Sequence, residues 1–134
     1  MSRDLSRVVI HHSASGRGTT REQIYDWHVN QRGWADIGYH YICLASGKVV
    51  PGRAFHLRGA HAGRSGNDYT GIVGTGWNGS SAPRANMGWS DKQIAGIQAF
   101  LDGYRILFPG STFDGHDKYK ATLCPGLDVH RVFR

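Results

Sequence analysis

The stretch VVIHHSAS, residues 8–15, decides both the fold class and the chemistry expected of this chain. Its first three residues, 8–10, are β-branched and apolar, which is typical of a buried strand. The strand runs into His11 and His12 and then into a loop rich in Ser, Gly and Thr. Because successive strand residues point to opposite faces, only one of the two histidines should reach a given metal ion.

Helical and extended patterns alternate after this strand. Thr20 and Gln23, like Ser90 and Gln93, have the spacing of a capping box, which marks the start of a helix. The expected elements are a helix to about residue 31, a hairpin over 39–50, a short strand over 71–76, a helix over 90–108, a short C-terminal helix, and irregular segments over 54–70 and 77–89. Because strands and helices interleave, we expect an α/β fold.

Length and composition exclude several classes of protein. A chain of 134 residues fits one domain, which we assign to residues 1–134. The hydrophobic content of 40% and aromatic content of 11% exclude intrinsic disorder. No apolar run approaches the roughly 18 residues of a membrane span. The opening residues MSRDL lack the apolar stretch of a signal peptide, so we expect synthesis in the cytoplasm.

The charge balance indicates the kind of partner. A formal net charge of +6 favours an anionic polymer or surface. The Lys and Arg residues are spread along the sequence and form no basic tract, and no RNA-binding or helix-turn-helix signature is present. We therefore expect no specific nucleic acid partner.

Histidine and cysteine supply the candidate chemistry. Cys43 falls in an apolar strand and is expected to be a small core residue. His11, His116 and Cys124 form a set of two imidazoles and one thiol, which suits Zn²⁺ and leaves a fourth position open for water. Because the three are far apart in the sequence, the pattern alone is a weak signal for a metal site, and it also fits two surface histidines and one buried cysteine.

Several further strings occur in order along nearly the whole chain. They are VVIHHSAS at 8–15, a helix ending in WH at 27–28, RGWADIGYHYI at 32–42, GAHAG at 59–63 and GHDKYKATLCPG at 115–126. In this order they resemble the zinc-dependent N-acetylmuramoyl-L-alanine amidase family, which includes phage endolysins and animal peptidoglycan-recognition proteins. The resemblance implies a single α/β domain with a central mixed β-sheet flanked by helices. It also implies a zinc site in a surface groove, with His11, His116 and Cys124 as the ligands.

The resemblance also implies roles for other residues. Tyr39 matches a family tyrosine needed for catalysis. Thr122 stands where the phage-type enzymes carry a lysine, so electrophilic assistance would come from its hydroxyl or from a neighbouring lysine, Lys118 or Lys120. The residues expected to line the substrate groove are His61, Arg64, Asn67 and Trp77. His12 and His40 are expected to be packed against the site without holding the metal.

The implied activity is zinc-dependent hydrolysis of the amide between N-acetylmuramic acid and L-alanine in peptidoglycan. The implied setting is that of a monomeric phage-type endolysin, which lyses bacteria by acting on the cell wall or periplasm after release through a membrane lesion. One alternative is a recognition module that binds muropeptide without cleaving it. Another is a cysteine peptidase with Cys124 as nucleophile, although this residue precedes a Pro-Gly turn and lacks the helix N-terminus that lowers a thiol pKa. Binding to a phage RNA polymerase is a further possibility that no residue tests.

Overall fold

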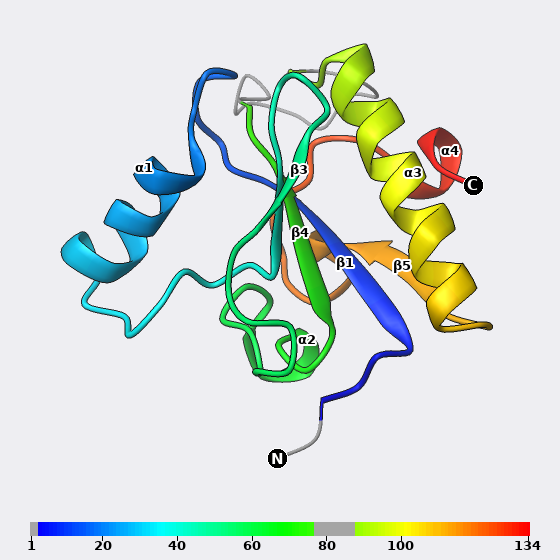
Figure 1. Ribbon diagram of the computed structural model, residues 1–134, viewed down its shortest axis with the longest axis horizontal. Coiled ribbons are helices and arrows are strands. Elements are labelled where there is room, and N and C mark those ends of the chain that lie inside the picture. Colours follow the sequence, from blue (N-terminus) through cyan, green and yellow to red (C-terminus); the bar gives the residue numbers. More distant parts are fainter. Residues whose placement is uncertain (1–2, 77–87) are drawn as a thin grey trace.

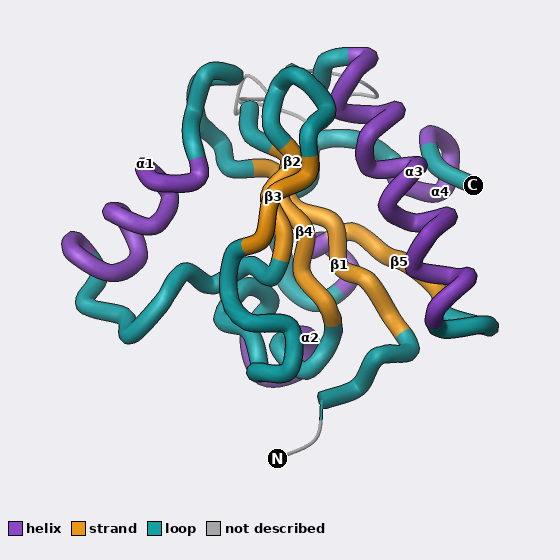
Figure 2. The backbone as a smooth tube through the Cα atoms, in the orientation of Figure 1, coloured by secondary structure: helices purple, strands orange, loops and turns teal. Residues whose placement is uncertain are grey.

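The computed structural model describes residues 3–76 and 88–134. Within these residues, five strands form one mixed sheet in the order β3-β2-β4-β1-β5 (Figures 1 and 2). The strands are β1 (Arg7–His12), β2 (Tyr41–Cys43), β3 (Val49–Pro51), β4 (Thr70–Gly74) and β5 (Thr112–Gly115). β1 pairs in parallel with β4 and β5, β2 pairs in parallel with β4, and β3 runs antiparallel to β2. The predicted α/β class and mixed sheet are confirmed.

The long helix α3 (Asp91–Leu107) covers one face of the sheet, which we call the helix face (Figure 1). Side chains that alternate along the strands meet apolar side chains of α3 and of the short helix α4 (Val129–Val132) there. The buried residues at the centre of this core are Val8, Ile10, Ile72, Ile97, Leu101, Phe113 and Val129. This face therefore holds the larger apolar core of the molecule.

The opposite face of the sheet carries Val9, His11, Ile42, Gly71 and Val73, and we call it the histidine face. A helix begins there at the capping box of Thr20 and Gln23, runs as α1 (Arg21–Tyr25) and continues as a π-helical segment, η1 (Asp26–Gln31). Its Ile24 packs on Ile37, Ile42 and Val73 in a small apolar cluster. Beside that cluster lie four buried histidines: His11, His28, His40 and His61.

The structure adds two short elements that the sequence analysis did not predict. The segment predicted to be irregular over 54–70 contains a four-residue helix, α2 (Gly63–Gly66). The strand β5 lies in the segment before His116, for which the sequence analysis predicted no element. His116 then begins a short 3-10 turn, η2 (His116–Lys118). Most of the predicted loop over 77–89 lies outside the described residues. Of the helices that the structure describes, none is long and apolar enough to cross a bilayer.

Candidate metal centre and active site

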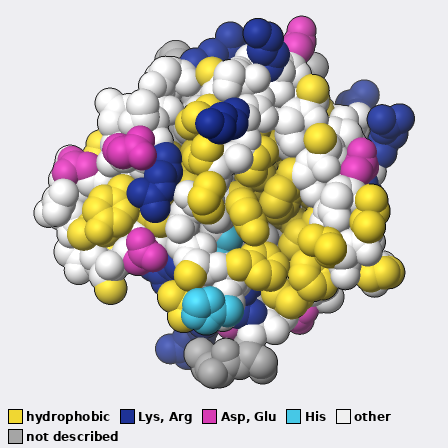
Figure 3. Space-filling view, in the orientation of Figure 1, with side chains coloured by type: hydrophobic (Ala, Val, Ile, Leu, Met, Phe, Trp, Pro, Cys, Tyr) yellow, Lys and Arg dark blue, Asp and Glu magenta, His cyan; other side chains and the backbone are white. Residues whose placement is uncertain are grey.

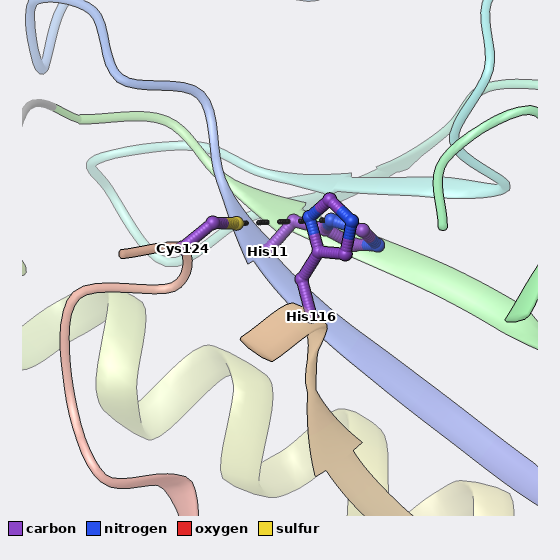
Figure 4. Close-up of side chains that lie close together, drawn as sticks. All are labelled: His11, His116 and Cys124. Atoms are coloured by element: carbon purple, nitrogen blue, oxygen red, sulfur yellow. Dashed lines mark hydrogen bonds between the residues drawn. The ribbon is translucent and has the colours of Figure 1, made fainter. Parts of the chain in front are cut away.

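His11, His116 and Cys124 converge at one edge of the sheet (Figure 4). His11 lies near the end of β1, and His116 directly follows β5, the parallel neighbour of β1. Because parallel strands end at the same edge of a sheet, this pairing brings two histidines together from distant parts of the chain. The loop after η2 then returns Cys124 to the same point. One donor atom from each of the three residues lies within 4.8 Å of the others.

The protonation states of this group favour cation binding. His11 is 1% exposed, and burial, followed by the neighbouring His61 and His116 rings, lowers its pKa well below the usual value. Burial also lowers the pKa of His116. Both imidazoles are therefore neutral at pH 7 and carry a lone pair that can bind a metal. Burial raises the pKa of the Cys124 thiol to about 12, so this thiol keeps its proton until a cation displaces it.

The donor set fits zinc. Two imidazole nitrogens and one sulfur are ordinary zinc ligands, and three protein donors correspond to a catalytic site with an open position. The Sγ atom of Cys124 lies 3.8 Å from Nδ1 of His11, so these two donors already face one another. Calcium and magnesium, which prefer oxygen ligands, do not match this set.

His12 does not join the converging group, as the alternation of strand side chains predicted. Its backbone N–H donates a hydrogen bond to Sγ of Cys124 over 3.3 Å. Its ring atom Nδ1 is buried and has no hydrogen-bond partner among the described residues. His12 therefore contacts the centre mainly through its backbone.

Tyr39 lies beside the centre, just before β2. Its ring centroid is 5.1 Å from that of His11. Burial, with a smaller contribution from Cys124, raises the pKa of this phenol, so Tyr39 holds its proton and can donate a hydrogen bond. Tyr39 also forms one wall of a cavity of about 350 Å³. The other lining residues are Ser13, Ile24, Trp27, His28, Gln31 and Arg32.

The sequence prediction did not include most of these cavity residues. Four of the cavity residues come from the π-helical segment η1 and the residue that caps its end: Trp27, His28, Gln31 and Arg32. They lie one to five positions apart in the sequence, so little more than one helical turn carries all four. In the sequence, this cavity could have been predicted from the close spacing of polar and aromatic residues just before the GYHY string at 38–41. Arg32 supplies a positive charge to the lining of the cavity, and it lowers the pKa of Tyr39 against the dominant effect of burial.

Thr122 lies two residues before Cys124 and is partly buried. Its Oγ1 accepts a hydrogen bond from the backbone N–H of Cys124 over 3.3 Å. The hydroxyl proton of Thr122 is therefore free to be directed toward another acceptor. Lys118 pairs instead with Asp114, with 3.7 Å between Nζ and Oδ1, and the exposed Lys120 lies close enough to lower the pKa of His116.

The predicted groove residues lie at different places. His61 is 9% exposed, and its Nδ1 lies 2.9 Å from Nε2 of His11. The Asn67 side chain accepts hydrogen bonds from the backbone N–H groups of His61 and Ala62, over 2.7 and 2.8 Å. Arg64 is exposed on α2, and Trp77 lies outside the described residues. Substrate binding by these four residues stays a prediction.

Comparison with known proteins establishes the family. The family model of N-acetylmuramoyl-L-alanine amidase matches residues 1–127. This chain belongs to the N-acetylmuramoyl-L-alanine amidase family. The resemblance carried by the five sequence strings is thereby confirmed.

Relatives of this amidase-family protein include both recognition proteins and endolysins. Peptidoglycan-recognition protein SC1a of Drosophila melanogaster is 31% identical over 143 residues, which cover 97% of this chain and 72% of the relative. The structure of Ph2119 endolysin from the Thermus scotoductus MAT2119 bacteriophage Ph2119 has a TM-score of 0.84 at 25% identity, covering 98% of this chain and 86% of the other. Drosophila peptidoglycan recognition protein SD has a TM-score of 0.81 at 26% identity, covering 98% and 81%.

Proposed function

We propose that this protein is a zinc-dependent N-acetylmuramoyl-L-alanine amidase, which hydrolyses the amide between N-acetylmuramic acid and L-alanine in peptidoglycan. The observation that carries the proposal is the convergence of His11, His116 and Cys124, in a chain of the amidase family. All three donors that a catalytic zinc site needs are present, including the cysteine. This favours an enzyme over a module that only recognises peptidoglycan.

His11, His116 and Cys124 would hold the zinc ion. When bound, zinc supplies Lewis-acid polarisation of a carbonyl and lowers the pKa of water toward about 7. Tyr39, which keeps its proton, donates a hydrogen bond to the attacking water or to the oxygen of the scissile carbonyl. Thr122 donates its hydroxyl proton to the negative charge that develops on that oxygen, because its acceptor side already bonds the Cys124 N–H.

The cavity beside Tyr39 supports an acidic substrate. Tyr39, whose ring centroid lies 5.1 Å from that of His11, lines this cavity, and so does Arg32. Carboxylates of a peptidoglycan stem peptide match this charge, as they match the net charge of +6. Lys and Arg side chains are scattered over the face seen in Figure 3 and do not form one basic patch there. The net charge therefore supports general attraction to an anionic polymer.

The first test is a Tyr39→Phe variant. Loss of one donor to the transition state typically lowers turnover by about 10²–10³-fold, and the phenol is not in the donor set, so zinc content should stay the same. Release of muropeptides from purified cell walls and metal analysis of the same sample measure the two effects. Tyr25→Phe, an exposed tyrosine on α1, is the matched control and should leave both unchanged. Full activity of the Tyr39→Phe variant would contradict the role given to the phenol.

Two rival functions give different results in the same assay. A recognition module would bind muropeptide and release no product even with zinc present. A cysteine peptidase would keep its activity in EDTA, whereas a zinc amidase should lose it and regain it with Zn²⁺. The raised pKa of the Cys124 thiol disfavours the peptidase, because a nucleophilic cysteine needs a lowered pKa.

We further propose that the protein acts as a monomeric phage-type endolysin, made in the cytoplasm and released to the cell wall through a membrane lesion. The likeness to Ph2119 endolysin supports this setting. Expression in bacteria should cause lysis only when the inner membrane is permeabilised, and the same protein added to isolated cell walls should act directly. Lysis without permeabilisation would contradict the proposed release. Gel filtration with light scattering tests the monomer.

A further inference from the structure

A second histidine is hydrogen-bonded to the first candidate ligand. Nδ1 of His61 lies 2.9 Å from Nε2 of His11, and both rings are buried. The two rings meet edge to face, with 4.9 Å between their centroids and an interplanar angle of 89°. His61 comes from the loop before α2, far from His11 in the sequence. It is not in the group of donors that converge at the metal centre.

The hydrogen bonds of His61 determine which nitrogen of each ring carries a proton. Nε2 of His61 lies 3.0 Å from the carbonyl oxygen of Tyr69. A carbonyl only accepts, so this Nε2 must donate, and Nδ1 of the neutral His61 ring is then an acceptor. His11 must consequently donate from Nε2. The lone pair of the neutral His11 ring is therefore on Nδ1, the atom that faces Sγ of Cys124 at 3.8 Å.

The position of the His61 ring is built into the surrounding backbone. A Cβ atom at Gly71 would lie 2.7 Å from the His61 ring, and one at Gly59 would lie 2.4 Å from its Cδ2 atom. Only residues without a side chain leave room for the ring at these two places. The Oδ1 atom of Asn67 also accepts a hydrogen bond from the backbone N–H of His61 over 2.7 Å. The ring is thus held both by its own hydrogen bonds and by close packing.

We propose that His61 is a positioning residue, which sets the tautomer and the orientation of His11 and so prepares the metal centre before a cation binds. Partners of this kind raise the basicity of a ligating imidazole and fix its direction. This changes the role expected for His61 from a groove residue to a support of the centre. The identity of the cation as zinc rests on the proposed function, whereas the tautomer follows from this chain alone.

The tautomer is tested on the metal-free protein by nuclear magnetic resonance. With ¹⁵N-labelled histidine, the His11 ring should show a protonated Nε2 and an unprotonated Nδ1. A coupling across the hydrogen bond should connect Nε2 of His11 with Nδ1 of His61. The absence of this coupling, with His11 protonated on Nδ1, would overturn the proposal without any variant being made.

Variants of His61 test the consequence for metal affinity. His61→Phe keeps an aromatic ring but has no acceptor for His11, and it should bind Zn²⁺ about 10–100-fold more weakly in competition with a chelator. His61→Asn places its Oδ1 near the former Nδ1, so it should recover most of the wild-type affinity. His28→Asn is the matched control: it replaces another buried histidine of the same face, one that accepts from the Gly38 N–H and does not bond His11. Its Zn²⁺ affinity should equal that of the wild type.

The outcomes separate this inference from the proposed function. If the wild type shows the His11–His61 coupling but binds no Zn²⁺, the amidase proposal fails and the assigned tautomer stands. If His61→Phe is folded and binds Zn²⁺ as tightly as the wild type, the positioning role fails, whatever the activity. If His61→Phe does not fold, His61→Asn and the coupling in the wild type decide. Near wild-type Zn²⁺ affinity of His61→Asn, together with the His11–His61 coupling in the wild type, supports the positioning role of His61. Weak Zn²⁺ binding by His61→Asn, together with no coupling in the wild type, overturns it.

Discussion

The two faces of the sheet are stabilised by different chemistry. The helix face buries aliphatic and aromatic side chains under α3 and α4. Among the residues that the structure describes, the histidine face has the smaller apolar cluster, centred on Ile24, Ile37, Ile42 and Val73, and beside it a set of buried imidazoles. Side chains on β1 alternate between these two environments, with Ile10 on the helix face and His11 on the other. One strand therefore supplies core stability and a candidate metal ligand at neighbouring positions.

The buried imidazoles of His28 and His40 on the histidine face are held by backbone groups. Nδ1 of His28 accepts the Gly38 N–H over 2.9 Å. Nδ1 of His40 accepts the Gly71 N–H over 3.1 Å, and its Nε2 donates to the Leu57 carbonyl over 2.7 Å. Buried polar groups are costly unless paired, so these bonds hold the rings in one arrangement. The helix face provides stability through burial, and the histidine face provides fixed, neutral donors.

Substitutions at the neighbouring positions 10 and 11 of β1 should separate the stability of the helix face from the metal binding of the histidine face, with the largest effects expected here. His11→Ala removes one of three donors, so Zn²⁺ binding and amidase activity should be lost, the latter by on the order of a thousandfold or more. Ile10→Ala leaves a cavity in the helix face and should lower the free energy of unfolding by about 2–5 kcal/mol. Zn²⁺ titration and urea unfolding, each with and without a chelator, measure both effects.

Zinc should still stabilise the Ile10→Ala variant, since ligand binding to the native state raises the unfolding free energy. It should not stabilise His11→Ala. Stabilisation of His11→Ala by Zn²⁺ at wild-type strength would mean that the cation binds elsewhere, and the contrast between the two faces would then be wrong.

The stability of the metal-free protein should fall as the pH falls from about 6.5 to about 4. Burial lowers the pKa of both His28 and His40 to about 4. In this window the unfolded chain binds protons at these rings and the native state does not, so acid favours unfolding. Each ring that stays neutral in the native state contributes a slope of about 1.4 kcal/mol per pH unit. Urea unfolding in EDTA across this range measures the slope.

His40→Gln should reduce the slope of unfolding free energy against pH by the contribution of one ring, about 1.4 kcal/mol per pH unit, because glutamine does not titrate. Ile10→Ala, on the helix face, is the control: it should shift the whole stability curve downward and keep its slope. An unchanged slope in His40→Gln would show that this imidazole does not oppose protonation in the native state.

Much of the helix face could be predicted from the sequence alone. The apolar run 8–10 and the capping box at Ser90 are local signals, and both elements form as predicted. The convergence of His11, His116 and Cys124 was implied only by the family resemblance, because it depends on the pairing of β1 with β5. The support given by His61 was missed. Its hydrogen bond joins residues 50 positions apart, and no spacing rule covers such a contact.

The smallest changes in unfolding free energy are expected at two glycines that sequence patterns alone do not distinguish. Gly96 and Gly103 both lie inside α3, and each should cost about 1 kcal/mol of helix stability relative to alanine. A Cβ atom at Gly96 would lie 2.2 Å from the carbonyl oxygen of Gly47, whereas one at Gly103 would meet nothing within 4 Å. Gly103→Ala should therefore raise the unfolding free energy by about 0.5–1 kcal/mol, and Gly96→Ala should lower it by about 1–3 kcal/mol, because the turn after β2 must move. Urea unfolding of the two variants decides, and a gain in stability from Gly96→Ala would contradict the close contact between α3 and that turn. Neither change touches the histidine face, so the Zn²⁺ affinity of both variants should match the wild type.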